Sequence, residues 1–331
     1  MMQAGADDLL QSICADGAVP SIPTVVLQIV HTAGDPGTGA SELVPLIEKD
    51  PALAAKTLKF ANSSYYGLAK PISSVQQALV RLGTRTVRLL ALSFGIVDAC
   101  SQAVPAFSLA SYWHRSLCMS AVARRVANQT VRKLADDAFI AGLLSDIGCP
   151  FLARHFPEKY KSVEALNRTG AKRLCDVEQS VLGISHAPVS AALLASWHLP
   201  ADLVEAVAAH HDLSGLARDS VPYPIAATVM VASELTDLIV GPSSLGRIDD
   251  LTRLIKDYYG LTPGHLNAIL KDLNPEVREI AQLLALPAPP APLILAEASK
   301  EALRLILADS GTGQGATPAA THAVPSSSGR R

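Results

Sequence analysis

The sequence is short of the residues that mark several common protein classes. Its 331 residues include only five cysteines, which stand far apart and form no Cys-x-x-Cys pair. An odd number of scattered cysteines argues against a disulfide framework and against a zinc knuckle. We therefore expect reduced, buried thiols, as in a cytoplasmic protein.

Membrane and nucleic-acid signals are also lacking. The first ten residues have neither a basic leader nor an apolar run, which argues against a signal peptide. Apolar segments such as 89–97 are too short to span a bilayer. The formal net charge is −2 with both signs mixed along the chain, so no basic patch indicates nucleic-acid binding. We expect a cytoplasmic protein that neither inserts into a membrane nor binds nucleic acid.

Aromatic residues make up only 5% of a chain that is 49% hydrophobic. Alanine and leucine dominate, while runs of valine and isoleucine are short, which favours helices over sheet. The sequence contains no Gly-x-Ser-x-Gly elbow, Walker loop or dinucleotide fingerprint. We predict an all-α protein, a multi-helix bundle without these catalytic signatures.

Helix boundaries can be placed from capping signals. Asp50 and Pro51 fit an N-cap and first helical position, Ser73 or Ser74 leads another helix, and Ser41 is expected to cap a third. The apolar stretch 221–240 is longer than a usual strand and predicts a buried helix. Further helices are expected at 7–16, 24–32, 51–61, 75–82, 84–100, 107–131, 157–168, 172–182, 186–197, 200–210 and 293–308. Another is expected to begin at Asp136 and Asp137 and to end in the Ser-Asp pair at 145–146, and Pro263 and Pro275 punctuate helices in the region 260–285.

Several motifs are specific in combination. Residues 46–53 read Leu-Ile-Glu-Lys-Asp-Pro-Ala-Leu, residues 60–67 read Phe-Ala-Asn-Ser-Ser-Tyr-Tyr-Gly, and residues 142–148 read Gly-Leu-Leu-Ser-Asp-Ile-Gly. Residues 113–116 and 186–189 read Trp-His-Arg-Ser and His-Ala-Pro-Val. Together they resemble the HDOD domain, a non-catalytic relative of the HD-type metal-dependent phosphohydrolases found in bacterial signalling proteins. The resemblance covers about 22–286.

The resemblance implies an HD-like helical bundle with an N-terminal helical subdomain. On this basis we expect an extension at 1–18 and an HDOD domain at 19–286, divided into an N-terminal half at 19–104 and an HD-like half at 105–286. A proline-rich connector and terminal helix follow at 287–309. The Gly, Ala, Thr, Ser and Pro composition of 310–331 predicts a disordered tail.

The resemblance also implies a degenerate metal site. An HD enzyme holds its metal with a histidine on a long helix, an adjacent His-Asp pair and a late aspartate. His114 matches the first, Ser145 replaces the paired histidine beside Asp146, and Ser233 takes the place of the late aspartate. Glu234 and Asp237 are not expected to project where Ser233 does. One imidazole and one carboxylate are too few for a catalytic metal site, so we expect no metal and no cofactor.

His186, His210 and His211 could still form a pocket with His114 and Asp146. Three interpretations stay open: hydrogen-bonded core histidines, a vestigial pocket that binds an anion or nucleotide, and a rebuilt metal site. Adjacent His210 and His211 are not expected to face one site from a regular helix.

A second candidate surface lies in the N-terminal half. Asn62, Tyr65 and Tyr66 follow a predicted helix end, where they either stabilise the turn or contact a partner.

The resemblance implies a non-enzymatic regulatory module, a pseudoenzyme in bacterial circuits such as cyclic-di-GMP signalling. The residues outside the domain leave no room for an output domain, so we expect signalling proteins as partners in trans, and homo-oligomer formation stays open. The alternatives are a divergent metal-dependent phosphohydrolase of a nucleotide or cyclic dinucleotide, and a nucleotide-sensing module that uses the vestigial pocket.

Overall fold

The computed structural model describes residues 12, 23–31, 40–63, 66–67, 69–101, 104, 107–240, 254 and 261–287. Every regular element in these ranges is a helix, which confirms the prediction of an all-α protein. The predicted helix 293–308 and the tail 310–331 lie outside the described residues, as does all of the predicted helix 7–16 except residue 12.

The N-terminal half consists of short helices whose starts follow the capping signals. Asp50 Oδ1 accepts hydrogen bonds from the backbone N–H groups of Ala52 at 2.9 Å and Leu53 at 3.1 Å, and the Ser74 hydroxyl accepts one from the Gln77 N–H at 3.2 Å. Ser41 is not a cap, because its helix already begins one residue earlier. The helices are α2 (Thr24–His31), α3 (Ala40–Glu48), α4 (Pro51–Ala61), α5 (Val75–Leu82) and α6 (Thr84–Cys100).

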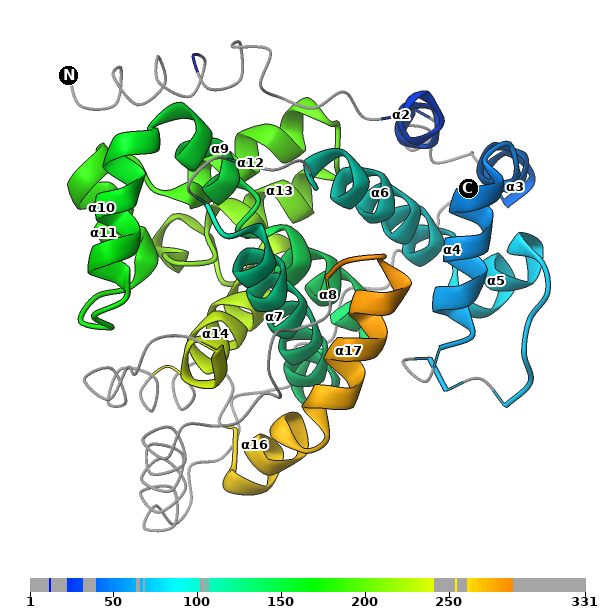
Figure 1. Ribbon diagram of the computed structural model, residues 1–331. Helices are drawn as coiled ribbons and strands as arrows, with labels where there is room; N and C mark the ends of the chain where they lie inside the picture. The colour runs from blue at the N-terminus through cyan, green and yellow to red at the C-terminus, as the bar shows by residue number, and fades with distance from the viewer. Residues whose placement is uncertain are drawn as a thin grey trace.

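The second half is built around one long helix, α7 (Leu109–Thr130). Its remaining elements are η2 (Arg132–Leu134), α8 (Ala135–Leu144), α9 (Gly148–His155), α10 (Pro157–Asn167), α11 (Leu174–Leu182), α12 (His186–Ser196), α13 (Ala201–Ala208), η3 (Leu213–Gly215), α14 (Pro222–Val240), α16 (Pro263–Leu270) and α17 (Leu273–Leu283). Helix α7 packs against α8, α14, α16 and α17 (Figure 1). Gly142 permits the close contact with α8, because a Cβ atom there would lie 3.0 Å from the Met119 carbonyl oxygen.

Helix α14 is an exception to the expectation that the apolar segments are too short to span a bilayer. Its 19 residues make it the one helix among the described residues that is long and apolar enough to cross a bilayer. It packs against α7, α8 and α13, and 67% of its most apolar window is buried inside the protein. Its composition is therefore explained by its place in the core, as predicted for 221–240.

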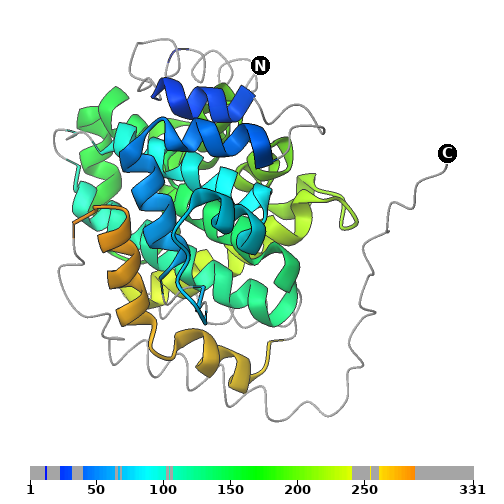
Figure 2. The same ribbon diagram turned by 90° about the vertical axis from the view of Figure 1, so that its right-hand side faces the viewer.

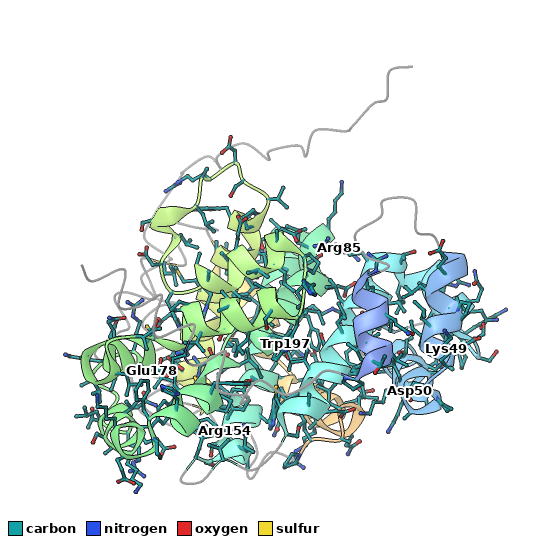
Figure 3. The ribbon with its side chains drawn as sticks, turned by 90° about the horizontal axis from the view of Figure 1, so that it is seen from above. Lys49, Asp50, Arg85, Arg154, Glu178 and Trp197 are labelled. Carbon is teal, nitrogen blue, oxygen red and sulfur yellow. The ribbon has the colours of Figure 1, made fainter. Side chains whose placement is uncertain are left out.

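The two halves share one hydrophobic core. Phe60 of α4 stacks against Phe94 of α6 and Phe139 of α8, with ring centroids 5.7 and 5.6 Å apart. At the border, the Arg85 guanidinium binds the carboxylates of Asp137 and Asp202, each at 2.7 Å. Figure 3 labels Arg85 in a view from above. Helices α16 and α17 run along one edge of the molecule, where α17 also contacts α4 (Figure 2).

Candidate functional site

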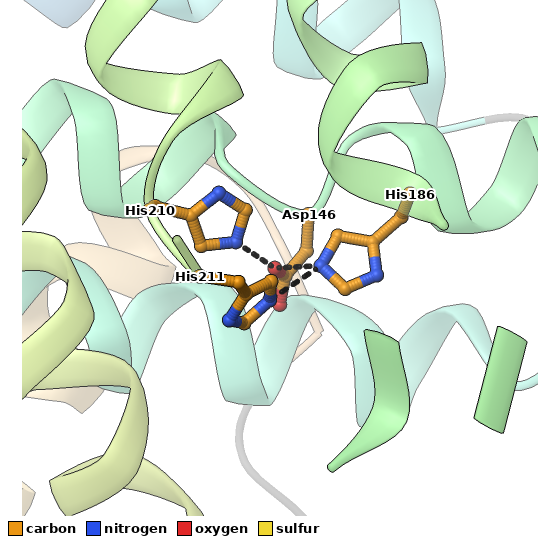
Figure 4. Close-up of side chains that lie close together, drawn as sticks. All are labelled: Asp146, His186, His210 and His211. Carbon is orange, nitrogen blue, oxygen red and sulfur yellow. Dashed lines mark hydrogen bonds and ion pairs between the residues drawn. The ribbon is translucent and has the colours of Figure 1, made fainter. Parts of the chain in front are cut away.

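Four polar side chains meet in the interior of the second half (Figure 4). They are Asp146, His186, His210 and His211, and one ligand atom from each lies within 4.8 Å of the others. Asp146 Oδ1 lies 3.2 Å from His186 Nε2 and 3.6 Å from His210 Nε2, and the Nε2 atoms of His186 and His211 are 3.0 Å apart. We call these four residues the histidine cluster.

Each member of the histidine cluster stands at a helix end. Asp146 lies in the tight turn between α8 and α9, which is marked by a hydrogen bond from the Cys149 N–H to the Asp146 carbonyl at 2.9 Å. His186 is the first residue of α12. His210 and His211 follow the last residue of α13 in a turn. Backbone at helix ends departs from the regular spacing of about 100° per residue, so all four can point inward.

A buried glutamate orients His186. Glu178 of α11 accepts a hydrogen bond from the His186 backbone N–H at 2.8 Å and faces His186 Nδ1 at 2.6 Å. The Tyr160 hydroxyl donates to its other carboxylate oxygen at 3.0 Å. On the other side of the cluster, His210 Nδ1 lies 2.6 Å from the Val207 carbonyl oxygen. A partner on Nδ1 fixes the ring so that Nε2 faces the cluster, an arrangement that is common behind metal-binding histidines.

An arginine closes the other face of Asp146. The guanidinium of Arg115, from α7, binds Asp146 Oδ2. Its Nη2 also donates to Asp237 Oδ1 at 2.9 Å and to the Ser233 hydroxyl at 3.0 Å, both on α14. Burial tends to lower the pKa of Arg115, but Asp146 and Asp237 outweigh it and raise the pKa. The guanidinium is therefore a permanent cation inside the site.

The charges of the site depend on its neighbours. Burial tends to raise the pKa of Asp146, but Arg115 and His186 hold it well below its ordinary range. Burial tends to lower the pKa of His186, yet Cys149, Glu178 and Asp146 raise it well above its ordinary value. Arg115 and His186 thus both stabilise the anionic form of Asp146.

The other two histidines stay neutral. Burial lowers the pKa of His210. Burial, together with the repulsion that a protonated His211 would meet from the neighbouring imidazoles, lowers the pKa of His211 well below its ordinary value. A neutral imidazole keeps one nitrogen lone pair free to accept a proton or to bind a cation.

A pocket of about 480 Å³ opens beside the cluster. His211 and Asp212 lie on one wall, Arg218 and Tyr223 supply a cation and an aromatic ring, and Met230 adds apolar surface. The pocket connects the half-buried His211 to the outside.

The comparisons with known proteins agree with this architecture. The family model of the HDOD domain matches residues 19–213, more than half of the chain. The chain belongs to the HDOD domain family. The match begins where the predicted domain begins and includes the histidine cluster and Arg115, but it ends before α14. The domain end at 286 and the internal division at 104 stay predictions.

Relatives of this HDOD protein are distant. It is 28% identical over 199 residues to an uncharacterized protein of Treponema pallidum (strain Nichols), an alignment that covers 59% of this chain and 38% of the relative. The chain therefore spans well under half the length of that curated relative.

Two solved structures show the same fold at 24% identity. An HDOD domain protein with unknown function from Geobacter sulfurreducens gives a TM-score of 0.59, with 89% of this chain and 93% of that chain covered. A "Putative signal transduction protein" from Marinobacter aquaeolei VT8 gives a TM-score of 0.60, with 81% and 60% covered. Similarity at this level establishes the fold of the HDOD protein and no activity.

The structure changes three expectations about the site. The residue of α7 that contacts the cluster is Arg115, which binds Asp146. Its neighbour His114 is not among the residues whose ligand atoms gather there. His210 and His211 do face one site, since α13 ends before them. Asp237 does lie on the same side of α14 as Ser233, one helical turn away, and both bind the arginine.

The two serines at predicted ligand positions have other partners. The Ser145 hydroxyl donates to the Ala141 carbonyl oxygen at 2.5 Å, within its own helix. Ser233 accepts a hydrogen bond from Arg115. Each hydroxyl is therefore engaged with protein groups in this structure.

Asn62 and Tyr66, the described residues of the predicted N-terminal surface, stabilise the fold through internal contacts. The Asn62 side chain donates to the Ile72 carbonyl at 2.8 Å and accepts from the Ile72 N–H at 2.7 Å, which ties the loop to the end of α4. The Tyr66 hydroxyl donates to Asp136 at 3.3 Å, and its ring lies under the guanidinium of Arg124. Tyr65 lies outside the described residues, so a partner surface here stays a prediction.

Sequence reasoning missed Arg115, Asp237 as its partner, and Glu178. Glu178 occupies a position on the apolar face of α11, between Cys175 and Leu182, which are both buried. An acidic residue on such a face is rarely buried unless it is paired, and this signal was present in the sequence. Nothing in the sequence indicates which of two adjacent residues on α7 turns inward.

Proposed function

We propose that this HDOD protein is a non-enzymatic signal-transduction module that acts through other proteins. The observation that carries the proposal is the ion pair between Arg115 and Asp146. Hydrolysis by an HD-type site needs a divalent metal that lowers the pKa of a bound water. In this chain the carboxylate that would bind the metal is already neutralised by a guanidinium.

The metal implied by the fold family can be tested against the residues present. The histidine cluster supplies suitable donors, and Asp146 Oδ1 and His210 Nε2 are buried without a well-aligned hydrogen bond from the described residues. The cluster alone therefore fits a metal that would activate water. Arg115 does not fit, because it places a positive charge on the same carboxylate.

Family membership supports a regulatory role, and the description of the Marinobacter aquaeolei VT8 protein points the same way. We infer that the partners are signalling proteins in trans within the bacterial cytoplasm. Cyclic-di-GMP signalling is the circuit we propose. Such a module would be a pseudoenzyme whose surfaces, rather than its interior, carry the signal.

One observation favours a second function, a nucleotide sensor. The pocket beside His211 places Arg218, suited to a phosphate, near Tyr223, suited to stacking on a base. A ligand that binds only the native state raises the melting temperature. Cyclic-di-GMP should then raise the melting temperature of wild type and leave that of Arg218→Ala unchanged, whereas a pure interaction module shows no shift in either.

The test of the main proposal is a turnover assay with the full chain. Wild type and Asp146→Asn are incubated with Mn²⁺ and either bis(p-nitrophenyl) phosphate or cyclic-di-GMP. Asp98→Asn, at an exposed carboxylate that pairs with Lys56, is the matched control. The proposal expects no product above buffer from any of the three. Product from wild type and Asp98→Asn that disappears in Asp146→Asn contradicts it and indicates a divergent phosphohydrolase.

A further inference from the structure

The histidine cluster holds the donors of a transition-metal site. One nitrogen from each of three imidazoles and one carboxylate oxygen lie within 4.8 Å of one another. Figure 4 shows the four side chains gathered at this place. Imidazole and carboxylate are ligands of Zn²⁺, which takes four ligands at about 2.0–2.2 Å from nitrogen or oxygen. Ligand atoms around one such ion lie about 3.3 Å apart. The separations of 3.0 Å between His186 Nε2 and His211 Nε2, and of 3.2 and 3.6 Å from Asp146 Oδ1 to His186 and His210 Nε2, are close to that spacing.

Two of the three imidazoles are also oriented by a partner at Nδ1. Glu178 faces Nδ1 of His186, and the Val207 carbonyl faces Nδ1 of His210. His186 and His210 are each at most 1% exposed. Rigid imidazoles that already point at a common centre lose little conformational freedom when a cation binds.

A permanently charged side chain opposes a cation at this centre. The guanidinium of Arg115 neutralises Asp146 through Oδ2. It is held there by Asp237, at 3.1 Å from Nε and 2.9 Å from Nη2, and by Ser233 at 3.0 Å. A second cation at Asp146 would meet this charge inside the protein, where screening is weak.

We propose that Arg115 keeps transition metals out of the histidine cluster, and that loss of its guanidinium turns the cluster into a binding site for one borderline divalent ion such as Zn²⁺ or Co²⁺. The inference rests on the proposed function, because it explains what holds the chain in a metal-free state. It assigns the exclusion to Arg115, because a guanidinium stays charged in a protein, whereas an imidazole gives up its proton when a metal ion binds.

The experiment is a Co²⁺ titration of the full chain after purification with chelator and dialysis. Co²⁺ bound by three imidazoles and a carboxylate absorbs visible light, which reports coordination without any enzyme assay. Arg115→Ala and Arg115→His are compared with wild type. His114→Ala is the matched control, because His114 precedes Arg115 on α7 and lies outside the cluster. A double variant, Arg115→Ala with His210→Ala, removes one proposed ligand.

We expect Arg115→Ala and Arg115→His to bind one Co²⁺ per chain, at least roughly 100-fold more tightly than wild type and His114→Ala, given the cost of breaking a buried ion pair. The double variant should lose most of this gain. Equal affinity of wild type and Arg115→Ala would overturn the inference, and so would no binding by either Arg115 variant.

The proposal can still be tested if Arg115→Ala folds less stably than wild type. Arg115→Ala leaves Asp146 and Asp237 without their cation, so its melting temperature is measured with and without Co²⁺. We expect Co²⁺ to raise it in Arg115→Ala but not in the double variant, and no rise in Arg115→Ala overturns the inference. Tight metal binding by wild type without phosphoester turnover would refute the proposed role of Arg115 and leave the non-enzymatic function standing.

Discussion

At the scale of single residues, the polar site in the described part of the chain is stabilised by pairing its buried carboxylates. Asp146 is shared by Arg115 and two histidines, and Glu178 accepts hydrogen bonds from His186 and Tyr160. A buried carboxylate without such partners would be protonated or would destabilise the fold. These contacts explain how the site can remain polar inside the core.

The lowered pKa values of His210 and His211 predict a loss of stability in acid. An unfolded histidine titrates near pH 6.5, so below that pH the unfolded chain binds protons that these two folded histidines do not. The free energy of unfolding should therefore fall as the pH drops below roughly 6.5, by at most about 1.4 kcal/mol per pH unit for each histidine. His186 has the opposite shift: its stabilisation is fully present below roughly pH 6.5 and is lost as the pH rises through its raised pKa, so it does not offset the acid loss.

Urea unfolding of wild type and His211→Asn at ~pH 7 and ~pH 5 checks this prediction. The variant should show a clearly smaller drop in unfolding free energy, whereas His155→Asn, outside the cluster, should match wild type. An equal drop in wild type and His211→Asn would show that His211 is protonated as easily in the folded protein as in the unfolded chain.

At the scale of elements, close helix contacts set the geometry of the site. Gly148, the first residue of α9, donates its N–H to the Ser190 hydroxyl of α12 at 2.9 Å. A Cβ atom at Gly148 would lie only 2.5 Å from the carbonyl oxygen of His186. The contact fixes the turn that carries Asp146 against the helix end that carries His186.

Gly148→Ala should therefore force α9 and α12 apart and lower the free energy of unfolding by about 1–3 kcal/mol, the usual cost of overpacking. Gly215→Ala is the matched control, because a Cβ there meets no atom within 4 Å. Urea unfolding measures both, and equal stability of the two variants would contradict this account of the contact.

Most helices could be predicted from the sequence because their signals are local. Asp50 and Ser74 cap their helices as their residue types indicate. The site could be predicted only in part, since it depends on contacts between distant segments. Asp237 was misplaced although it is one helical turn from Ser233, and Arg115 reaches Asp146 across 31 positions of the chain. Contacts between residues that are so far apart in the chain leave no periodic pattern in the sequence.

At the scale of the whole molecule, the core extends past the family match. Helix α14 is buried against α7 and α8, and α17 packs on α7 and α4. Arg125 of α7 binds the Glu276 carboxylate at 2.5 Å and the Ile269 carbonyl oxygen at 2.8 Å. The segments after 213 thus complete the core rather than add a separate unit.

A fragment of residues 19–213 should therefore fail to fold cooperatively, because it exposes the faces of α7 and α8 that α14 covers. A fragment of residues 19–287 should unfold in one cooperative transition. Circular dichroism during urea unfolding distinguishes the two, and a single sharp transition in the shorter fragment would place the domain end at 213.

The central claim is that Arg115, rather than a metal ion, neutralises Asp146 in the native protein. The measurement that tests it most directly is the divalent metal content of untagged wild type, purified without chelator and analysed by plasma mass spectrometry. The account predicts manganese, iron and zinc at background level. Near-stoichiometric metal that is lost in Asp146→Ala would contradict it.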